Sequence, residues 1–336
     1  MRLVGLDYAK GIAIILIVWA HADIKMDPAL YATDFKFIHS VIYSFHLYTF
    51  FVIAGIAAKL SMDRITFDFG SYMRKLLKRL LIPFYTLSSI FLLLNVSLPP
   101  SLTHAPSLKA MIMSLTFMQT QQDYLPSGVL WFLFVLCACA LVHVLMIKII
   151  RINIYAWLGI ALSTSLAASN LGEIYLLGFG EITRNIFFYV FGYSISDYYV
   201  NGRLGERFID VVVFLAFWLL GFVLLERGYY ACRIITGVAG ALVLLWVTSN
   251  LFQVKAAWVL HKIRFLGRNT MEIYVLHMPV FVIIFNLLHT QNNLQNWAGL
   301  LIAVIAGLAC PLLIAKALRL LPRVYTVMFG SYPHAE

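Results

Sequence analysis

Three ionisable residues, Asp7, Lys10 and His21, lie in an otherwise apolar stretch near the start of the chain, LDYAKGIAIILIVWAH. An ionisable group inside a bilayer is costly, so such residues indicate a functional site. At about 100° per helical residue, Lys10 and His21 point within about 20° of each other, and Asp7 lies within about 40° of His21. Lys10 and His21 are also about 16 Å apart along the axis, roughly half the hydrocarbon thickness. A helix here would hold a cation near one water boundary and, on the same face, an imidazole well across the membrane.

Two other interpretations of this stretch stay open. Arg2, the apolar run 12–20 and the small residues on either side of His21 are typical of a secretory signal peptide. Against this, Asp7 and Lys10 intrude where such a peptide should be plainly cationic. Alternatively, Lys10 and His21 only anchor the two helix ends at opposite interfaces.

Polar residues recur inside two later apolar stretches. His46 lies in SFHLYTFFVIAG, while Glu272 and His277 lie in GRNTMEIYVLHMP. Each alone could be a hydrogen-bonded packing residue, since polar side chains also join helices in membranes. Together with His21, however, they make three embedded histidines and a carboxylate. This set favours general base catalysis, because imidazole suits proton transfer near neutral pH and a carboxylate can fix its tautomer.

A basic run, RKLLKRLLIPF, opens the third apolar stretch and contains Arg74, Lys75, Lys78 and Arg79. Cations spaced by three and four residues form a compact patch on a helix, which could bind a multiply phosphorylated ligand. The alternative is an ordinary cytosolic anchor that meets anionic lipid headgroups.

The composition is that of a polytopic membrane protein. The chain has 336 residues, of which 62% are hydrophobic and 12% charged, about half the charged fraction of soluble domains. We predict an all-α membrane bundle of about ten transmembrane helices that forms one integral domain over residues 1–336. The predicted spans are 3–22, 39–60, 76–97, 128–150, 154–171, 183–199, 208–226, 231–251, 270–289 and 297–321.

The charge of the chain predicts its orientation. With both termini in the cytosol, nineteen of the 25 lysines and arginines fall in cytosolic segments, as the positive-inside rule requires. The net charge of +10 is therefore explained by the lysines and arginines of the cytosolic segments, and no nucleic-acid partner is expected.

The four cysteines lie in or beside apolar runs without metal-ligand spacing, so we predict neither a metal site nor a disulfide framework. They are Cys137, Cys139, Cys232 and Cys310.

These stretches resemble the acyltransferase-3 membrane proteins, the O-acyltransferases that modify bacterial surface glycans. The family's basic residue and the histidine that follows it correspond to Lys10 and His21. SFHLYTFFVIAG is similar to the family's second span, LWFLFVL from Leu130 to its tryptophan-bearing fourth span, and FLGRNTMEIYVLHMP to its penultimate conserved block. The four segments occur in the family's order and cover most of the chain.

The chain also departs from the family pattern. Tyr48 stands where the second block has proline, and Ala54 where it has serine. The family's RxxR pair reads Lys75 and Lys78 here, with Arg79 alongside. Lysine offers a point charge in place of the bidentate fork of arginine, which bears on the phosphate-binding role of this run.

The resemblance implies a membrane O-acyltransferase that moves an acyl group, with a preference for acetyl, from cytosolic acyl-CoA to a hydroxyl of a cell-surface or lipid-linked carbohydrate. It implies a general base at His21, with Asp7 or Lys10 holding the first helix and the donor, and His46 in the same polar cavity. The remaining assignments are substrate binding by His277, Glu272 and Trp131, and CoA phosphate binding by Lys75, Lys78 and Arg79.

Further expectations concern the reaction and its setting. Acetyl-CoA acts as a co-substrate, with no permanently bound cofactor, and transfer is direct because no cysteine or serine is placed as an obvious nucleophile. The protein is expected in the bacterial cytoplasmic (inner) membrane, among membrane lipids; its oligomeric state is left open. The rival interpretation is a proton-coupled transporter or flippase, in which the same embedded groups relay protons or bind a substrate. A purely structural scaffold would leave the embedded ionisable residues without a reason.

Overall fold

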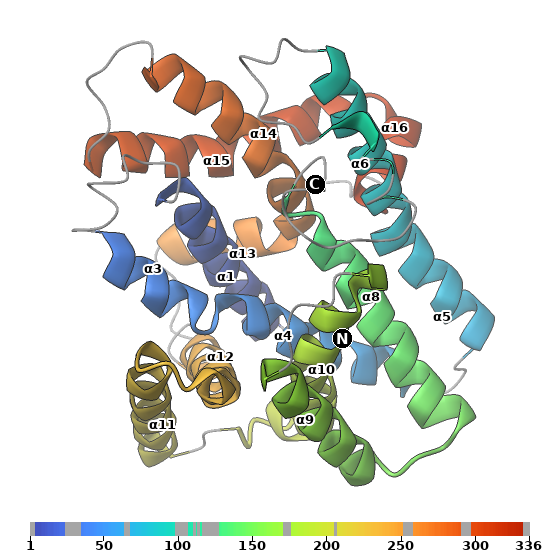
Figure 1. The fold of residues 1–336 in the computed structure, drawn as a ribbon, viewed down its shortest axis with the longest axis vertical. Coiled ribbons are helices and arrows are strands. Elements are labelled where there is room, and N and C mark those ends of the chain that lie inside the picture. Colours follow the sequence, from blue (N-terminus) through green and yellow to red (C-terminus); the bar gives the residue numbers. More distant parts are fainter. Residues whose placement is uncertain are drawn as a thin grey trace. The chain divides into compact units, whose positions relative to one another are not determined.

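The protein is described from a computed structural model. The structure describes residues 4–23, 35–63, 68–97, 107–109, 112, 115, 128–170, 176–204, 207–250, 258–289 and 297–331. Within these ranges every regular element is helical (Figure 1). The prediction of an all-α membrane bundle is therefore confirmed.

The helices follow the chain in the order shown in Figure 1. Their bounds are α1 Val4–Asp23, α3 Lys36–Tyr43, α4 His46–Met62, α5 Phe69–Leu76, η2 Leu77–Leu81, α6 Ile82–Ser97, α8 Trp131–Val144, η3 Leu145–Ile149, α9 Ile154–Asn170, η4 Leu176–Gly178, α10 Phe179–Val200, α11 Phe208–Glu226, η5 Tyr230–Cys232, α12 Arg233–Asn250, α13 Trp258–Arg268, α14 Thr270–His289, α15 Trp297–Leu318 and α16 Pro322–Phe329.

Seven helical segments in the described part of the chain are long and apolar enough to cross a membrane. They coincide with predicted spans, as do α9, α10 and α14. Helix α9 is apolar but shorter than the seven, and the first turns of α10 carry Glu181, Arg184 and Asn185, which lower its hydropathy. The predicted span 39–60 is divided, because a turn at Ser44 and Phe45 separates α3 from α4.

The chain forms two compact units. The first unit consists of Met1–Leu60 and Phe188–Leu312, and the second of Ser61–Phe187 and Leu313–Glu336. The predicted single domain over residues 1–336 stays a prediction.

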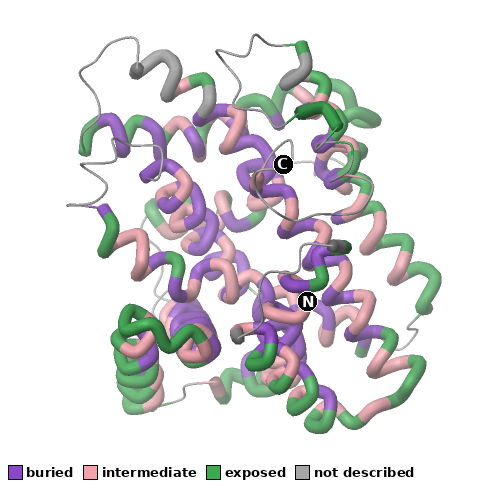
Figure 2. The backbone as a smooth tube through the Cα atoms, in the orientation of Figure 1, coloured by how far each residue is buried: buried purple, intermediate pink, exposed green. Residues whose placement is uncertain are grey.

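In the first unit, α1 is largely enclosed by the rest of the protein. Most of its side chains are buried (Figure 2), whereas α11 exposes large apolar residues such as Phe217, Leu219 and Leu220. Exposed apolar side chains of this kind are expected where a helix faces lipid. Helix α1 is thus an interior helix, and it is the least apolar of the seven candidate spans in the described part of the chain.

Glycines allow α1 and α13 to approach at backbone distance. Gly11 faces the carbonyl oxygen of Ile263, and Gly267 faces the carbonyl oxygen of Asp7, so a side chain at either position would overlap the opposite backbone. Small residues at such crossings are the usual way in which membrane helices pack closely. Gly55 of α4 and Gly192 of α10 make a second crossing of this type, against Tyr189 and Val52.

We expect Gly267→Ala to destabilise the protein by about 1–3 kcal/mol or more, because the added methyl group overlaps the backbone of α1. Gly159→Ala is the matched control, since a methyl group on this helical glycine of α9 meets no atom within 4 Å. This control should be neutral or stabilising by about 0.5–1 kcal/mol. Thermal unfolding in detergent measures both; equal midpoints for the two variants would contradict the close α1–α13 crossing.

Candidate active site

Two histidines that are 256 residues apart in the chain meet in the first unit. His21 Nδ1 of α1 lies 2.8 Å from His277 Nε2 of α14. The rings are nearly parallel, with 6° between their planes and 5.1 Å between their centroids. His277 is fully buried and His21 is half-buried. The structure therefore joins two residues that the sequence placed on separate spans.

The backbone of α14 determines which nitrogens carry protons. His277 Nδ1 lies 2.7 Å from the carbonyl oxygen of Tyr274. A carbonyl oxygen only accepts, so Nδ1 must be the protonated nitrogen of a neutral His277 ring. Its Nε2 then accepts from His21, and His21 must donate from Nδ1. This leaves the lone pair of a neutral His21 on Nε2, the nitrogen that can take a proton from a substrate.

His46 is buried at the first turn of α4. Its Nδ1 donates to the carbonyl oxygen of Ile42, at 2.7 Å across the α3–α4 turn. The turn itself is held by Ser44, whose hydroxyl donates to Val41 and accepts from the indole of Trp218. His46 is therefore placed by the same break in the helix that divides the predicted second span.

The structure adds a histidine hydrogen-bonded to a carboxyl group, which the sequence reasoning missed. His39 Nδ1 of α3 lies 2.8 Å from Asp23 Oδ1 at the end of α1, and Asp23 is fully buried. The ring of His39 stacks on Tyr43 with 4.0 Å between centroids, and Tyr43 meets the ring of His46 edge-on. The spacing His39, Tyr43, His46 is that of one helical face, so the pattern was present in the sequence.

Asp7 lies near the opposite end of α1 and is paired with α13. Its Oδ2 is 3.5 Å from Nε of Arg268 and 3.9 Å from Nε of Arg264. The carboxylate is 2% exposed, so these guanidinium groups offset its desolvation. Lys10 is half-buried one turn further along α1. Whether Asp7 and Lys10 also serve the reaction stays a prediction.

The remaining predicted residues fall in both units. Glu272 is buried on α14, five residues before His277, in the first unit. Trp131 is half-buried at the start of α8, in the second unit, where its ring meets Phe132 edge-on. The first unit thus brings together His21 and His277, and separately His46 with the unpredicted Asp23, His39 and Tyr43.

The basic run lies in the second unit on an irregular helix. Lys75 lies in the last turn of α5, while Lys78 and Arg79 lie in the π-helical turn η2, and all three are exposed. Single π-helical turns often mark functional positions. Gly330, at the end of α16, packs against the backbone of Lys78 and Arg79 in a left-handed conformation that leaves no room for a side chain.

Asp68 caps the helix that leads to this basic run. Its carboxylate accepts from the backbone amides of Gly70 and Ser71. Hydrogen bonds from the Ser71 side chain and from these amides hold the pKa of Asp68 below its ordinary value. Asp68 therefore stays ionised and fixes the start of α5 without occupying the cationic face.

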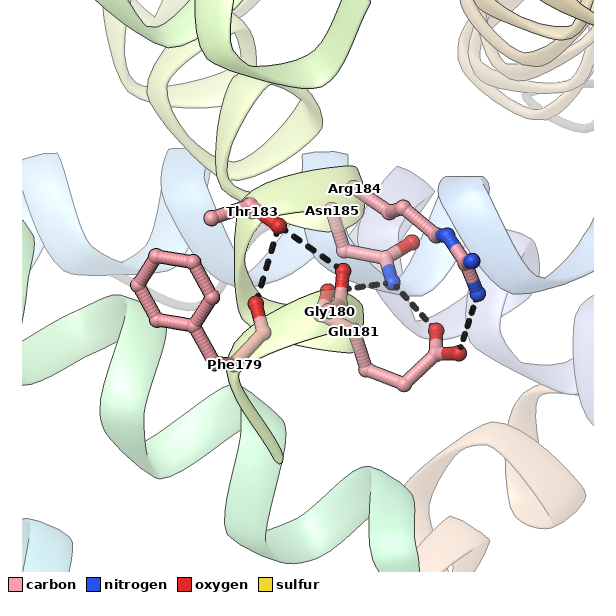
Figure 3. A network of polar contacts seen from close by, with 6 residues as sticks. All are labelled: Phe179, Gly180, Glu181, Thr183, Arg184 and Asn185. Carbon is pink, nitrogen blue, oxygen red and sulfur yellow. Dashed lines mark hydrogen bonds and ion pairs between the residues drawn. The ribbon is translucent and has the colours of Figure 1, made fainter. Parts of the chain in front are cut away.

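A further polar network, in the second unit, lies at the start of α10 (Figure 3). Glu181 accepts from Nη1 of Arg184 at 2.9 Å and from Nδ2 of Asn185 at 3.3 Å, and Thr183 donates to the carbonyls of Phe179 and Gly180. The sequence reasoning did not select these residues. Their bonds neutralise a carboxylate on an otherwise apolar helix, which is the arrangement expected for a structural network.

Among the residues that the structure describes, no group of three or more His, Cys, Asp or Glu is arranged to hold a metal ion.

The fold and the site define an integral membrane helical protein with two hydrogen-bonded histidines inside its first unit. A family model described as an acyltransferase domain matches residues 3–316, nearly the whole chain. The chain therefore belongs to the acyltransferase-3 family, and the protein is a multi-pass membrane acyltransferase. Comparison with curated proteins and with solved structures finds no match.

We expect Asp7→Asn to destabilise the protein by about 3 kcal/mol, because Arg264 and Arg268 lose the buried charge that they pair with. Asp197→Asn is the matched control, since Asp197 is exposed and lies 3.7 Å from Lys59. An exposed pair contributes about 0–1 kcal/mol. Thermal unfolding in detergent compares the two; similar small shifts in both would show that Asp7 is not a structural charge.

Proposed function

We propose that this acyltransferase moves an acetyl group from cytosolic acetyl-CoA to a hydroxyl of a cell-surface or lipid-linked carbohydrate, with His21 as general base. The observation that carries the proposal is the hydrogen bond from His21 to His277. It gives the neutral His21 ring one protonation pattern and leaves Nε2 as the basic nitrogen, so the base needs no rearrangement before it acts.

The proposed reaction is a direct transfer. His21 Nε2 removes the proton of the acceptor hydroxyl as its oxygen attacks the thioester carbonyl. The tetrahedral intermediate then collapses, the carbon–sulfur bond breaks, and the CoA thiolate leaves and receives the proton from His21. Such general acid–base catalysis is typically worth about 10²- to 10⁴-fold. His277 serves as a positioning residue, because it holds the His21 ring through its Nε2 and is itself held by the Tyr274 carbonyl.

The other assigned residues complete the proposal. Lys75, Lys78 and Arg79 bind the CoA phosphates, supported by their exposure on a π-helical turn. His46, Glu272 and Trp131 contact the substrates, and Lys10 assists the donor. The reaction takes place in the bacterial cytoplasmic membrane with the donor on the cytosolic side. Membership of an acyltransferase family favours this reaction over a proton-coupled transporter or flippase.

We expect His21→Gln to lower kcat by about 10²- to 10⁴-fold, because glutamine keeps some hydrogen bonding but cannot accept a proton at neutral pH. His277→Ala should lower kcat less, since the base remains but its tautomer is no longer held. His261→Gln, an exposed histidine of α13, is the matched control and should transfer normally. The measurement is CoA release by membranes supplied with acetyl-CoA and extracted glycans. Near wild-type turnover by correctly inserted His21→Gln would mean that another residue is the general base.

We expect joint replacement of Lys75, Lys78 and Arg79 by Gln to weaken acetyl-CoA binding several-fold or more, since charge-assisted contacts to phosphate are lost. Acceptor binding should hardly change. Lys316→Gln with Arg323→Gln removes two exposed cations of the same unit and serves as the control. Equilibrium binding of acetyl-CoA to the purified variants decides the point. Unaltered affinity of the triple variant for acetyl-CoA would mean that this basic run contacts lipid headgroups and not the CoA phosphates.

A further inference from the structure

The ring of Tyr43 is held rigidly and is still open to its surroundings. Tyr43 is the last residue of α3, and the residue as a whole is 38% exposed. His39 stacks on the ring with 4.0 Å between centroids and 27° between planes, and His46 meets it at 67° with 4.8 Å between centroids. Two imidazoles thus fix the orientation of an aromatic side chain that remains accessible.

A buried charge supports this arrangement. Asp23 is fully buried, and its Oδ1 lies 2.8 Å from Nδ1 of His39. Burying a carboxylate is expensive unless it is paired. Here its partner is the imidazole that stacks on Tyr43, so the pair holds the supporting ring in one position. A tyrosine that merely anchors a helix at the membrane interface needs no such support.

The cluster and the paired histidines share helix α1. Asp23 follows His21 by two residues on α1. All these residues belong to the first unit. Tyr43 is therefore in the same unit as the residues to which the proposed function assigns proton transfer, and the carboxyl group behind its supporting ring shares a helix with His21.

The chemistry of the cluster indicates its ligand. A pyranose presents a flat face of C–H groups with hydroxyls around its rim. Such a face matches an aromatic ring, which offers a large apolar surface at little cost in conformational freedom, while neighbouring polar groups can orient the hydroxyls. We propose that Tyr43, supported by His39 and Asp23, is the platform on which the pyranose ring of the acceptor stacks. This inference rests on the proposed function, because it assigns the acceptor of that same site.

Saturation-transfer NMR tests the platform on the full-length protein in detergent. The probes are methyl pyranosides of glucose, galactose, rhamnose and N-acetylglucosamine, with the open-chain alditol sorbitol for comparison. We expect at least one pyranoside, but not sorbitol, to receive saturation on the C–H protons of one ring face. Tyr43→Leu should abolish this transfer and Tyr43→Phe should keep it. Tyr230→Leu is the matched control and should also keep it, since Tyr230 is an exposed tyrosine of the same unit.

Absence of transfer from the wild-type protein to every pyranoside, or equal transfer from Tyr43→Leu, would overturn the platform. The proposed function is measured separately, as CoA release with extracted glycans. If the protein transfers acetyl groups but Tyr43→Leu leaves pyranoside binding unchanged, only the role of Tyr43 as a platform is contradicted. If pyranoside binding depends on Tyr43 but the protein transfers no acetyl group, the binding site is supported and the proposed reaction is contradicted.

Discussion

The structure depends most on the hydrogen bond between His21 and His277, because it links two helices from opposite ends of the sequence and determines which nitrogen of His21 can act as a base. A bond of 2.8 Å tolerates little movement of either helix. Packing on all sides restricts that movement. Gly307 of α15 lies against Phe281 of α14 and Val18 of α1, and the ring of Phe281 meets His277 edge-on. His21, the proposed base, is thus positioned by the same contacts that hold α1 inside the first unit.

Helix α1 carries a carboxyl group near each end, and each is paired with a different part of the first unit. Asp7 pairs with arginines of α13, and Asp23 pairs with His39 of α3. An unpaired carboxylate at either position would be costly in an apolar environment. The two pairs fix α1 along its axis, and the glycine crossing with α13 fixes its distance from the neighbouring backbone. His21 lies between these constraints, close to the Asp23 end.

Hydropathy alone was enough to predict the helical class and the position of ten helices, because lipid requires long apolar segments whose backbone is bonded internally. The helical spacing also placed Asp7, Lys10 and His21 on one helix. Their partners could not be predicted in the same way. The segment 258–268 is too polar to span a bilayer and was assigned to a connection, yet it forms α13 and supplies Arg264 and Arg268. Asp23 was overlooked because it ends an apolar run, where a charge is normally solvated, and the structure buries it against His39.

The protonation pattern of His21 can be measured directly by ¹⁵N NMR of histidine-labelled protein at neutral pH, with its signals identified by their loss in His21→Gln. We expect a neutral His21 ring with its proton on Nδ1 and a nearby acceptor nitrogen. In His277→Phe, which removes that acceptor, we expect a mixture of both tautomers. A wild-type ring protonated on Nε2, or a His21 signal that does not change when His277 is removed, would contradict the claim that His277 prepares His21 as the base.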